Sequence, residues 1–227
     1  MSTEADWKKL LAVQEVLQSH FPDLVLVGGT ASALHAGHQV SLDADHVLSD
    51  LRVSFDGVLA DLEALAGWKT SRAKRPVLIL GKLEGVETGI RQLIRQLPLE
   101  TETVQGIRVP TLPEMLRVKA WLVVTRNKAR DHLDTCALAD KLGPASTIEA
   151  LISLDALYPQ ESGETVTRQL CKQLAQPLPD DLEGLDLAVY RDLQPPWTSW
   201  AYVKERCLEL SDLVASGLLG LSGDPRS

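Results

Sequence analysis

The Gly28-Gly29 pair constrains the fold more than any other part of the chain, because the segments on its two sides require different structures. Residues 24–27 form a short, fully apolar run that is typical of a buried strand, and residues 30–36 indicate a short helix that Gly37 ends. Glycines let the backbone approach a ligand closely, and free amides at the start of a helix attract phosphate oxygens. The sequence therefore predicts a strand, a Gly-Gly turn that holds phosphates, and a helix.

An Asp43-Ala44-Asp45 stretch follows the glycine pair after 13 residues, within a second strand-like segment at residues 40–48. Aspartates two apart on a strand point to the same face, where their carboxylates repel each other unless a cation lies between them. Mg²⁺ is typically held by one or two carboxylates and completes its coordination with water and phosphate oxygens. We therefore expect Asp43 and Asp45 to hold Mg²⁺, or Mn²⁺, on a nucleoside triphosphate.

The remaining pattern alternates strands with helices and then becomes entirely helical. Between residues 68 and 109, short apolar runs separated by Gly81, Gly85, Pro98 and Gly106 indicate three or four strands. Helical spacing of apolar groups is seen in the segments 7–19, 55–66, 111–125, 127–142, 147–157, 165–175 and 199–219. We expect an α/β (α+β) fold with a small mixed sheet flanked by helices in residues 1–110 and a helical region in residues 111–227, whose last part, 143–227, is a helical tail.

Charge is distributed unevenly along the chain, although the net charge of −8 argues against indiscriminate binding to nucleic acids. Residues 66–130 carry 13 basic and 5 acidic side chains, a surplus of 8, whereas residues 1–65 carry 3 and 10 and residues 131–227 carry 7 and 16. Ordinary solvated surface explains most single charges. A whole segment of one sign also suits a polyanion, such as RNA or a triphosphate, or an acidic partner.

No apolar run reaches the roughly 18 residues that a membrane-spanning helix needs, and residues 1–9 are acidic and polar where a signal peptide would be basic and then apolar. We therefore expect a cytoplasmic protein with no membrane partner. The three cysteines, Cys136, Cys171 and Cys207, are far apart in sequence and indicate neither a disulfide framework nor a zinc site.

The glycine pair and the aspartates together resemble a family motif. A hydrophobic residue, Gly-Gly or Gly-Ser, a spacer and Asp-hydrophobic-Asp form the pattern of the polymerase-β-like nucleotidyltransferase superfamily, and residues 27–29 and 43–45 fit it. Residues 28–45 are similar to the AbiEii/AbiGii toxin branch, known from abortive-infection and toxin–antitoxin systems. Further similarity in order and spacing lies in Ile79-Leu80-Gly81, residues 106–109, Lys119, Arg126, Arg130-Asp131 and Asp134. The resemblance covers residues 24–142.

The resemblance implies roles for the residues that match. Asp43 and Asp45 would bind metal, Gly28, Gly29 and Thr30 would contact phosphates, and Lys119 with Asp131 or Asp134 would complete the catalytic site in residues 111–142. Lys119 and Arg126 are seven apart and hence on one helix face, from which both can reach triphosphate oxygens. The alternative is structural, because Arg130 and Asp134 have the spacing of a surface ion pair, and Asp131 suits the first turn of a helix. His35 and His38 are expected to be structural.

One position departs from the pattern of the resembled family. Members usually carry a third carboxylate on a later strand, where it ligates metal and accepts the proton of the nucleophile, and this chain has Gly89 there. Glu87 is two residues earlier and would project from the same face of that strand. The sequence leaves open whether Glu87 substitutes for the missing carboxylate.

The resulting functional hypothesis is a Mg²⁺-dependent nucleotidyltransferase that transfers a nucleotidyl group from a nucleoside triphosphate to a hydroxyl of tRNA, another RNA or a protein. The resemblance also implies a toxin role with a cognate antitoxin protein. Two alternatives stay open: a catalytically degenerate nucleotide-binding or interaction module of the same fold, and an aminoglycoside-type nucleotidyltransferase, which would favour an acidic cleft over the basic segment.

Overall fold

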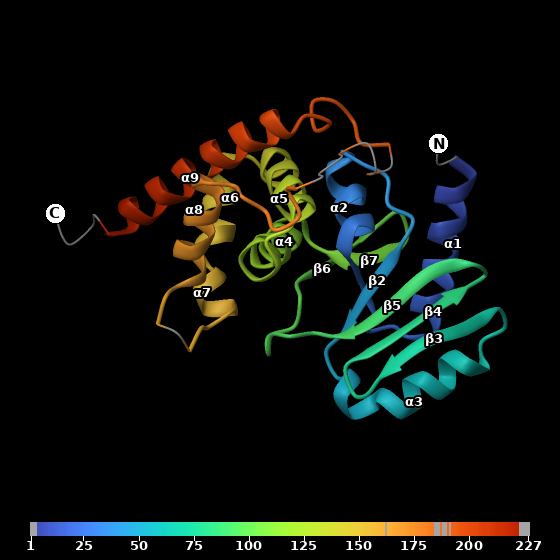
Figure 1. Cartoon of the computed structure of the whole chain (residues 1–227). Coiled ribbons are helices and arrows are strands. Elements are labelled where there is room, and N and C mark those ends of the chain that lie inside the picture. The colour runs from blue at the N-terminus through green and yellow to red at the C-terminus, as the bar shows by residue number, and fades with distance from the viewer. Residues whose placement is uncertain (1–3, 162, 184–186, 188–189, 191, 223–227) are drawn as a thin grey trace. The chain divides into compact units, whose positions relative to one another are not determined.

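The computed structural model describes residues 4–161, 163–183, 187, 190 and 192–222 (Figure 1). The chain forms two compact units, Met1–Thr111 and Leu112–Ser227, and each is described by itself. The N-terminal unit contains α1 (Glu4–His20), β1 (Val25–Val27), α2 (Gly28–Ala36), β2 (Ala44–Leu48), α3 (Leu51–Ala64), β3 (Trp68–Lys74), β4 (Leu78–Leu83), β5 (Val86–Gln92), β6 (Thr101–Val104) and β7 (Ile107–Pro110). The C-terminal unit contains α4 (Leu112–Arg126), α5 (Ala129–Leu142), α6 (Pro144–Ile152), α7 (Leu154–Leu157), α8 (Val166–Ala175) and α9 (Trp200–Ser222).

The N-terminal unit is built on a five-stranded mixed sheet with the strand order β1-β2-β5-β4-β3. Only β2 and β5 run parallel, and the other neighbouring pairs are antiparallel. β6 and β7 form a separate antiparallel pair, and β7 lies against β1 and α1. The parallel pair at the centre of the sheet brings Ala44–Leu48 level with Thr88–Gln92, so residues 45 and 89 are direct neighbours.

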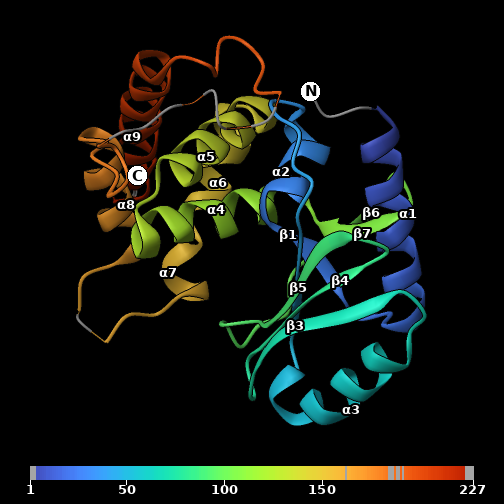
Figure 2. The ribbon, with the colours of Figure 1, turned by 45° about the vertical axis from the view of Figure 1, so that its right-hand side comes forward.

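One face of this sheet packs against α1 and α3 to make the hydrophobic core. The buried residues come from all three layers: Val13, Leu17, Leu24, Leu48, Leu51, Phe55, Val58, Leu62, Trp68, Ile79, Leu83 and Ile90. Figures 1 and 2 both show α3 alongside β3. Position 81 of β4 requires glycine because the Trp68 ring covers it: an added Cβ would lie 2.5 Å from an atom of that ring. We call this side of the sheet the core face and the opposite side the open face.

Tight turns set the register of the hairpins. Glu84 and Gly85 connect β4 to β5 with positive φ angles of 51° and 84°, the conformation of a two-residue hairpin turn whose second position favours glycine. This turn aligns Leu83 with Val86 and thereby fixes Gly89 opposite Leu80. The position of Gly89 in the sheet is therefore determined by local turn chemistry.

The C-terminal unit is entirely helical in its described residues. α4 packs against α5, α6 and α8, and α9 packs against α5, α6 and α8. Cys136 of α5 and Cys207 of α9 are both buried with their Sγ atoms 3.5 Å apart, whereas Cys171 is partly exposed and all three thiols are free. Among the described residues, no helix combines the length and the apolar character needed to cross a lipid bilayer.

The structure confirms the predicted fold class, a mixed sheet flanked by helices followed by a helical region, and it corrects several boundaries. Residues 68–110 form five strands where three or four were predicted: a turn at residues 75–77 separates β3 from β4, and Gly81, which was expected between strands, lies within β4. Gly28 and Gly29 are the first two residues of α2 and not a separate turn. β2 begins at Ala44, so Asp43 directly precedes the strand.

Candidate functional site

The N-terminus of α2 lies against the aspartate strand. Val27, the last residue of β1, pairs with Asp45 of β2, and Gly28 then starts the helix with a φ of 75°. A Cβ added to Gly28 would lie 3.3 Å from both Cβ and Oδ2 of Asp45. Gly28 therefore provides the positive φ and the close approach that a larger residue would oppose. Gly28 and Asp45, which the sequence pattern combines, thus lie directly against each other.

Thr30 holds the backbone ahead of β2. Its buried hydroxyl donates to the carbonyl oxygens of Asp43 and Ser41, at 2.7 and 3.3 Å. Thr30 was expected to contact phosphates, and its hydroxyl is fully buried and donates its proton within the fold. Thr30 therefore fixes the position of Asp43 relative to α2, and any contact of residue 30 with phosphate would have to come from its backbone amide.

Asp43 and Asp45 present their side chains away from the core, as the alternation of the strand predicts. Asp43 is exposed and 44% of the Asp45 side chain is exposed, whereas Ala44 and His46 are buried between and beside them. His46 Nδ1 lies 3.3 Å from the Gly89 carbonyl oxygen, and burial lowers the pKa of His46 to about 4. A neutral His46 thus sits on the core face directly behind the aspartates.

Gly89 lies beside Asp45, where the resembled family usually carries its third carboxylate. The register pairs the two residues, and a Cβ built on Gly89 would lie 3.1 Å from Asp45 Oδ1 and 3.0 Å from Leu80 Cδ2. A side chain at this position would therefore point at the aspartate. The absence of a carboxylate at residue 89 leaves a gap in the predicted catalytic set.

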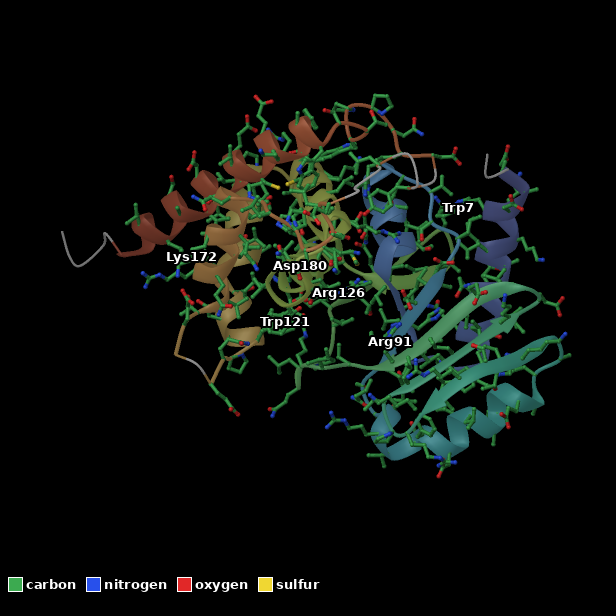
Figure 3. All side chains as sticks on the ribbon, viewed as in Figure 1. Trp7, Arg91, Trp121, Arg126, Lys172 and Asp180 are labelled. Atoms are coloured by element: carbon green, nitrogen blue, oxygen red, sulfur yellow. The ribbon has the colours of Figure 1, made fainter. Side chains whose placement is uncertain are left out.

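Arg91 lies close to this position, and it was not predicted from the sequence. It is two residues beyond Gly89 on the same face of β5, and its Nε lies 3.6 Å from Asp45 Oδ1, with 50% of its side chain exposed (Figure 3). An exposed pair of this kind contributes about 0–1 kcal/mol to stability. The signal available in the sequence was the spacing of two residues from Gly89, which places both on one strand face.

Glu87 projects from the same face of β5 but is engaged elsewhere. The register pairs Glu87 with Lys82, and the two side chains form an ion pair on β4 and β5. Both are about half exposed. Glu87 therefore has a partner one strand away from Asp45, which weakens the idea that it replaces the missing carboxylate.

The other predicted residues lie in the C-terminal unit, in a cluster around the buried Lys119. Lys119 Nζ of α4 lies 2.7 Å from Asp134 Oδ2 and 4.0 Å from Asp131 Oδ1 of α5, and these three side chains are at most 4% exposed. Arg126 Nε lies 3.6 Å from Asp131 Oδ2, with 58% of the arginine side chain exposed. Burial raises the pKa of the Asp131 carboxyl, while Lys119 and Arg126 oppose that rise.

This cluster corrects one of the two sequence interpretations. The interpretation that placed Asp134 at the surface is wrong, because Asp134 is fully buried and pairs with Lys119. The expectation that Lys119 and Arg126 share a helix face is confirmed, since both contact Asp131. His35 and His38 are structural as expected: Nε2 of His35 lies 2.8 Å from the Pro110 carbonyl oxygen, and His38 is buried.

Asp43 and Asp45 are the candidate metal ligands at the start of β2. Among the described residues, no group of three or more His, Cys, Asp or Glu side chains is arranged to hold a metal ion. Two carboxylates nevertheless match the donor set of Mg²⁺ that arrives with a triphosphate, since phosphate oxygens and water complete its octahedron. The residues therefore fit a nucleotide-bound Mg²⁺ better than a free one.

Comparison with known sequences gives partial matches. No protein-family model matches the chain. It is 32% identical over 124 residues to the heme uptake protein MmpL11 of Mycobacterium tuberculosis, covering 52% of this chain and 12% of that protein. It is 30% identical over 129 residues to the mycolic acid-containing lipids exporter MmpL11 of Mycolicibacterium smegmatis, covering 52% of this chain and 13% of that protein. The chain thus spans about an eighth of the length of these relatives.

Comparison with solved structures matches almost the whole chain. JHP933 from Helicobacter pylori has a TM-score of 0.59 at 16% identity, covering 98% of this chain and 97% of its own. A proposed nucleotidyltransferase from H. pylori has a TM-score of 0.53 at 17% identity, covering 99% of this chain and all of its own. Identities this low establish the fold alone. The chain has a nucleotidyltransferase-like fold.

Proposed function

We propose that the chain is a Mg²⁺-dependent nucleotidyltransferase, which binds a nucleoside triphosphate between the N-terminus of α2 and the carboxylates of Asp43 and Asp45. The observation that carries the proposal is the contact of Gly28 with Asp45, because it places a helix N-terminus without a side chain directly beside a half-exposed carboxylate. The helix N-terminus that can hold phosphate and the carboxylate that can hold its cation thus lie next to each other.

The phosphates are held mainly by backbone groups. The first amides of a helix have no intrahelical partner, so the amides of Gly28, Gly29 and Thr30 are free to bind phosphate oxygens at the positive end of the α2 dipole. The two glycines keep the approach open. Arg91 adds a guanidinium from β5 that can turn from Asp45 to a phosphate oxygen, since half of its side chain is exposed.

In the reaction, a hydroxyl oxygen of the acceptor forms a bond to the α-phosphorus while the bond from that phosphorus to the bridging oxygen breaks and pyrophosphate leaves. Bound Mg²⁺ would neutralise the charge that builds on the phosphate oxygens. Asp43 and Asp45 would hold the Mg²⁺ in place, and the N-terminus of α2 aligns the triphosphate. Gly89 offers no base, so the acceptor proton passes to water and we expect slow turnover.

The acceptor classes are an RNA hydroxyl, including that of tRNA, and a protein hydroxyl. A toxin role with a cognate antitoxin follows only from the resemblance to the AbiEii/AbiGii branch. Heme uptake and lipid export are the named functions of MmpL11 proteins about eight times longer than the matched segment. They provide no chemistry for the residues around Asp45.

A second function is favoured by a specific observation. Gly89 removes the usual base, and Arg91 supplies a cation to Asp45 where a metal would otherwise bind. A nucleotide-binding module without turnover would have these features. The rival aminoglycoside-type enzyme is disfavoured by the exposed cations Lys69, Arg72 and Lys74 on the same sheet, which would repel a cationic drug.

Label transfer separates these possibilities. The protein is incubated with each of four nucleoside triphosphates labelled at the α-phosphate, Mg²⁺ or Mn²⁺, and either total RNA or a protein mixture. Label that appears in RNA or protein, and that is lost in Asp45→Asn, supports the enzyme. Tight metal-dependent binding of nucleotide without transfer to any acceptor supports the module, and the absence of nucleotide binding contradicts both.

A further inference from the structure

The open face of the sheet carries a row of cations on the same side as the proposed site. Antiparallel partners project from one face, and Lys69, Arg72 and Lys74 of β3 pair with Lys82, Leu80 and Leu78 of β4. Leu80 in turn pairs with Gly89, and Gly89 pairs with Asp45. The register therefore places the β3 cations on the open face with Asp45, three strands away.

A β-bulge in β3 places the three cations on the same face of the sheet. Lys69 and Arg72 are three residues apart, so in a regular strand they would project from opposite faces. The register shifts between Thr70 and Arg72, which leaves Ser71 as the extra residue. This single insertion re-aims the second half of β3 and brings all three cations to one face.

These cations are available to a partner. Lys69, Arg72 and Lys74 are exposed, and among the described residues no acidic side chain is paired with any of them. Arg75, the next residue, behaves differently, because it pairs with Asp56 of α3 and its guanidinium carbon lies 5.4 Å from the centre of the Phe55 ring. Arg75 therefore supports the core side of the sheet and is excluded from the row.

We propose that the open face, from Asp45 across β5 and β4 to the cations of β3, binds the phosphate backbone of a single-stranded polynucleotide that is the acceptor of the proposed transfer; the proposal thus rests on the proposed function. Three strand spacings separate β2 from β3, about 14 Å, which a few nucleotides span. Lys69, Arg72 and Lys74 bind phosphates at the far end, and Arg91 lies near the proposed reaction centre.

The composition of this face specifies how the strand is recognised. The only aromatic residue in β3, β4 and β5 is Trp68, which lies in the core. Bases therefore have no aromatic ring on these strands to stack on, and stacking is the usual source of base contact in single-strand binding. Recognition through Lys69, Arg72 and Lys74 is consequently electrostatic and independent of sequence, with about three phosphate contacts.

The test compares two variants with the same change in net charge. Lys69→Glu/Arg72→Glu/Lys74→Glu reverses the row, and Lys141→Glu/Arg168→Glu/Lys204→Glu reverses three exposed cations of the C-terminal unit. Binding is measured by fluorescence anisotropy of labelled 12-nucleotide RNA and DNA strands, each in two unrelated sequences, over a range of salt concentrations.

We expect the affinity of the wild-type protein to fall with salt with a logarithmic slope of about −2, which is the value for about three phosphates on a single strand. The β3 variant should lose at least about tenfold in affinity, whereas the C-terminal variant should stay within about twofold. The neutral variant Lys69→Gln/Arg72→Gln/Lys74→Gln should lie between them, and circular dichroism confirms that each variant is folded. Binding of RNA, DNA or both with this pattern supports the proposal, and their ratio identifies the acceptor strand.

Three outcomes would overturn it. Equal losses in the β3 and C-terminal variants would show that only overall charge matters, and a preference of more than tenfold for one sequence would exclude backbone recognition. If polyglutamate or anionic lipid vesicles compete as effectively as RNA at the same concentration of negative charge, the face binds another polyanion. Nucleotide binding by the β3 variant, measured with Mg²⁺ and triphosphate alone, should be unchanged, so failure here is distinguishable from failure of the proposed function.

Discussion

Gly89 is the position that matters most for the proposed nucleotidyl transfer. Its neighbours are Asp45 and Leu80, and a Cβ at residue 89 meets only the ends of their side chains. Such contacts are tight but adjustable, because a carboxylate and a Leu methyl can each rotate. The spacing of the β5 residues pointed to Gly89 as the position of the carboxylate in the resembled family, and the register places this residue beside Asp45. Arg91 became visible only in the folded structure, where its Nε lies 3.6 Å from Asp45 Oδ1.

Gly89→Asp should raise the rate of nucleotidyl transfer by at least about tenfold, which corresponds to about 1.4 kcal/mol of barrier, because it adds a proton acceptor and a third metal ligand beside Asp45. Initial rates with an α-labelled triphosphate measure the change. Gly89→Ala is the matched control, since it adds the same Cβ without a carboxylate and should give no gain. Equal rates in both variants would contradict the proposed role of this position.

His132 gives a pH dependence of stability whose sign is determined by its burial. Burial lowers the pKa of His132 below the value of about 6.5 that it has in the unfolded chain. Below pH 6.5 the unfolded state therefore binds a proton that the folded state resists, so stability is full above this pH and falls as the pH drops.

In His132→Gln the stability lost between pH 7.5 and 5.5 should be smaller than in the wild-type protein. Urea unfolding at both pH values measures it, and comparing the two proteins cancels the contribution of His46. An unchanged loss in the variant would mean that folding does not lower the pKa of His132.

At the scale of elements, the α4–α5 pair is joined by charge as well as by apolar packing. Lys119, Asp131 and Asp134 are buried together, and taking charges out of water is costly unless each has a partner. Periodicity predicted both helices and the shared face of Lys119 and Arg126. It did not predict that Asp134 is buried, because a single polar position in a helix does not reveal which neighbouring helix covers it.

Lys119→Met should destabilise the protein by about 3–5 kcal/mol, since it removes the ammonium group that lies 2.7 Å from the buried Asp134 carboxylate. Lys119→Met/Asp134→Leu should recover most of that loss, because Asp131, whose pKa burial already raises, can take up a proton. Denaturant unfolding of the three proteins measures this coupling. If the single variant is as stable as the wild-type protein while nucleotide binding falls, Lys119 serves the ligand and not the fold.

The bulge in β3 could not be predicted from the sequence. Strands were predicted in this segment, but Lys69 and Arg72 have a spacing that assigns them to opposite faces in a regular strand. The register shift at Ser71 depends on the pairing of β3 with β4, which only the folded sheet specifies. Lys69, Arg72 and Lys74 therefore share the open face with Asp45, whereas Arg75 turns toward Asp56.

At the scale of the whole molecule, the order of strands and helices was readable because each follows from local periodicity and turn residues. The net charge of −8 concealed the basic face, since the acidic residues lie mostly outside residues 66–130. The Asp45 site belongs to the unit Met1–Thr111, and the Lys119 cluster belongs to the unit Leu112–Ser227.

The most direct test of the account is Mg²⁺-dependent triphosphate binding by Asp45→Asn, measured by calorimetry together with the thermal stability of the metal-free protein. The substitution keeps the shape of the side chain and removes the charge that faces Gly28 and Arg91. We predict an affinity loss of at least tenfold, about 1.4 kcal/mol, with metal-free stability changed by no more than the small contribution of an exposed ion pair. Strong destabilisation of the metal-free protein with unchanged nucleotide affinity would make Asp45 a structural residue and contradict the proposed site.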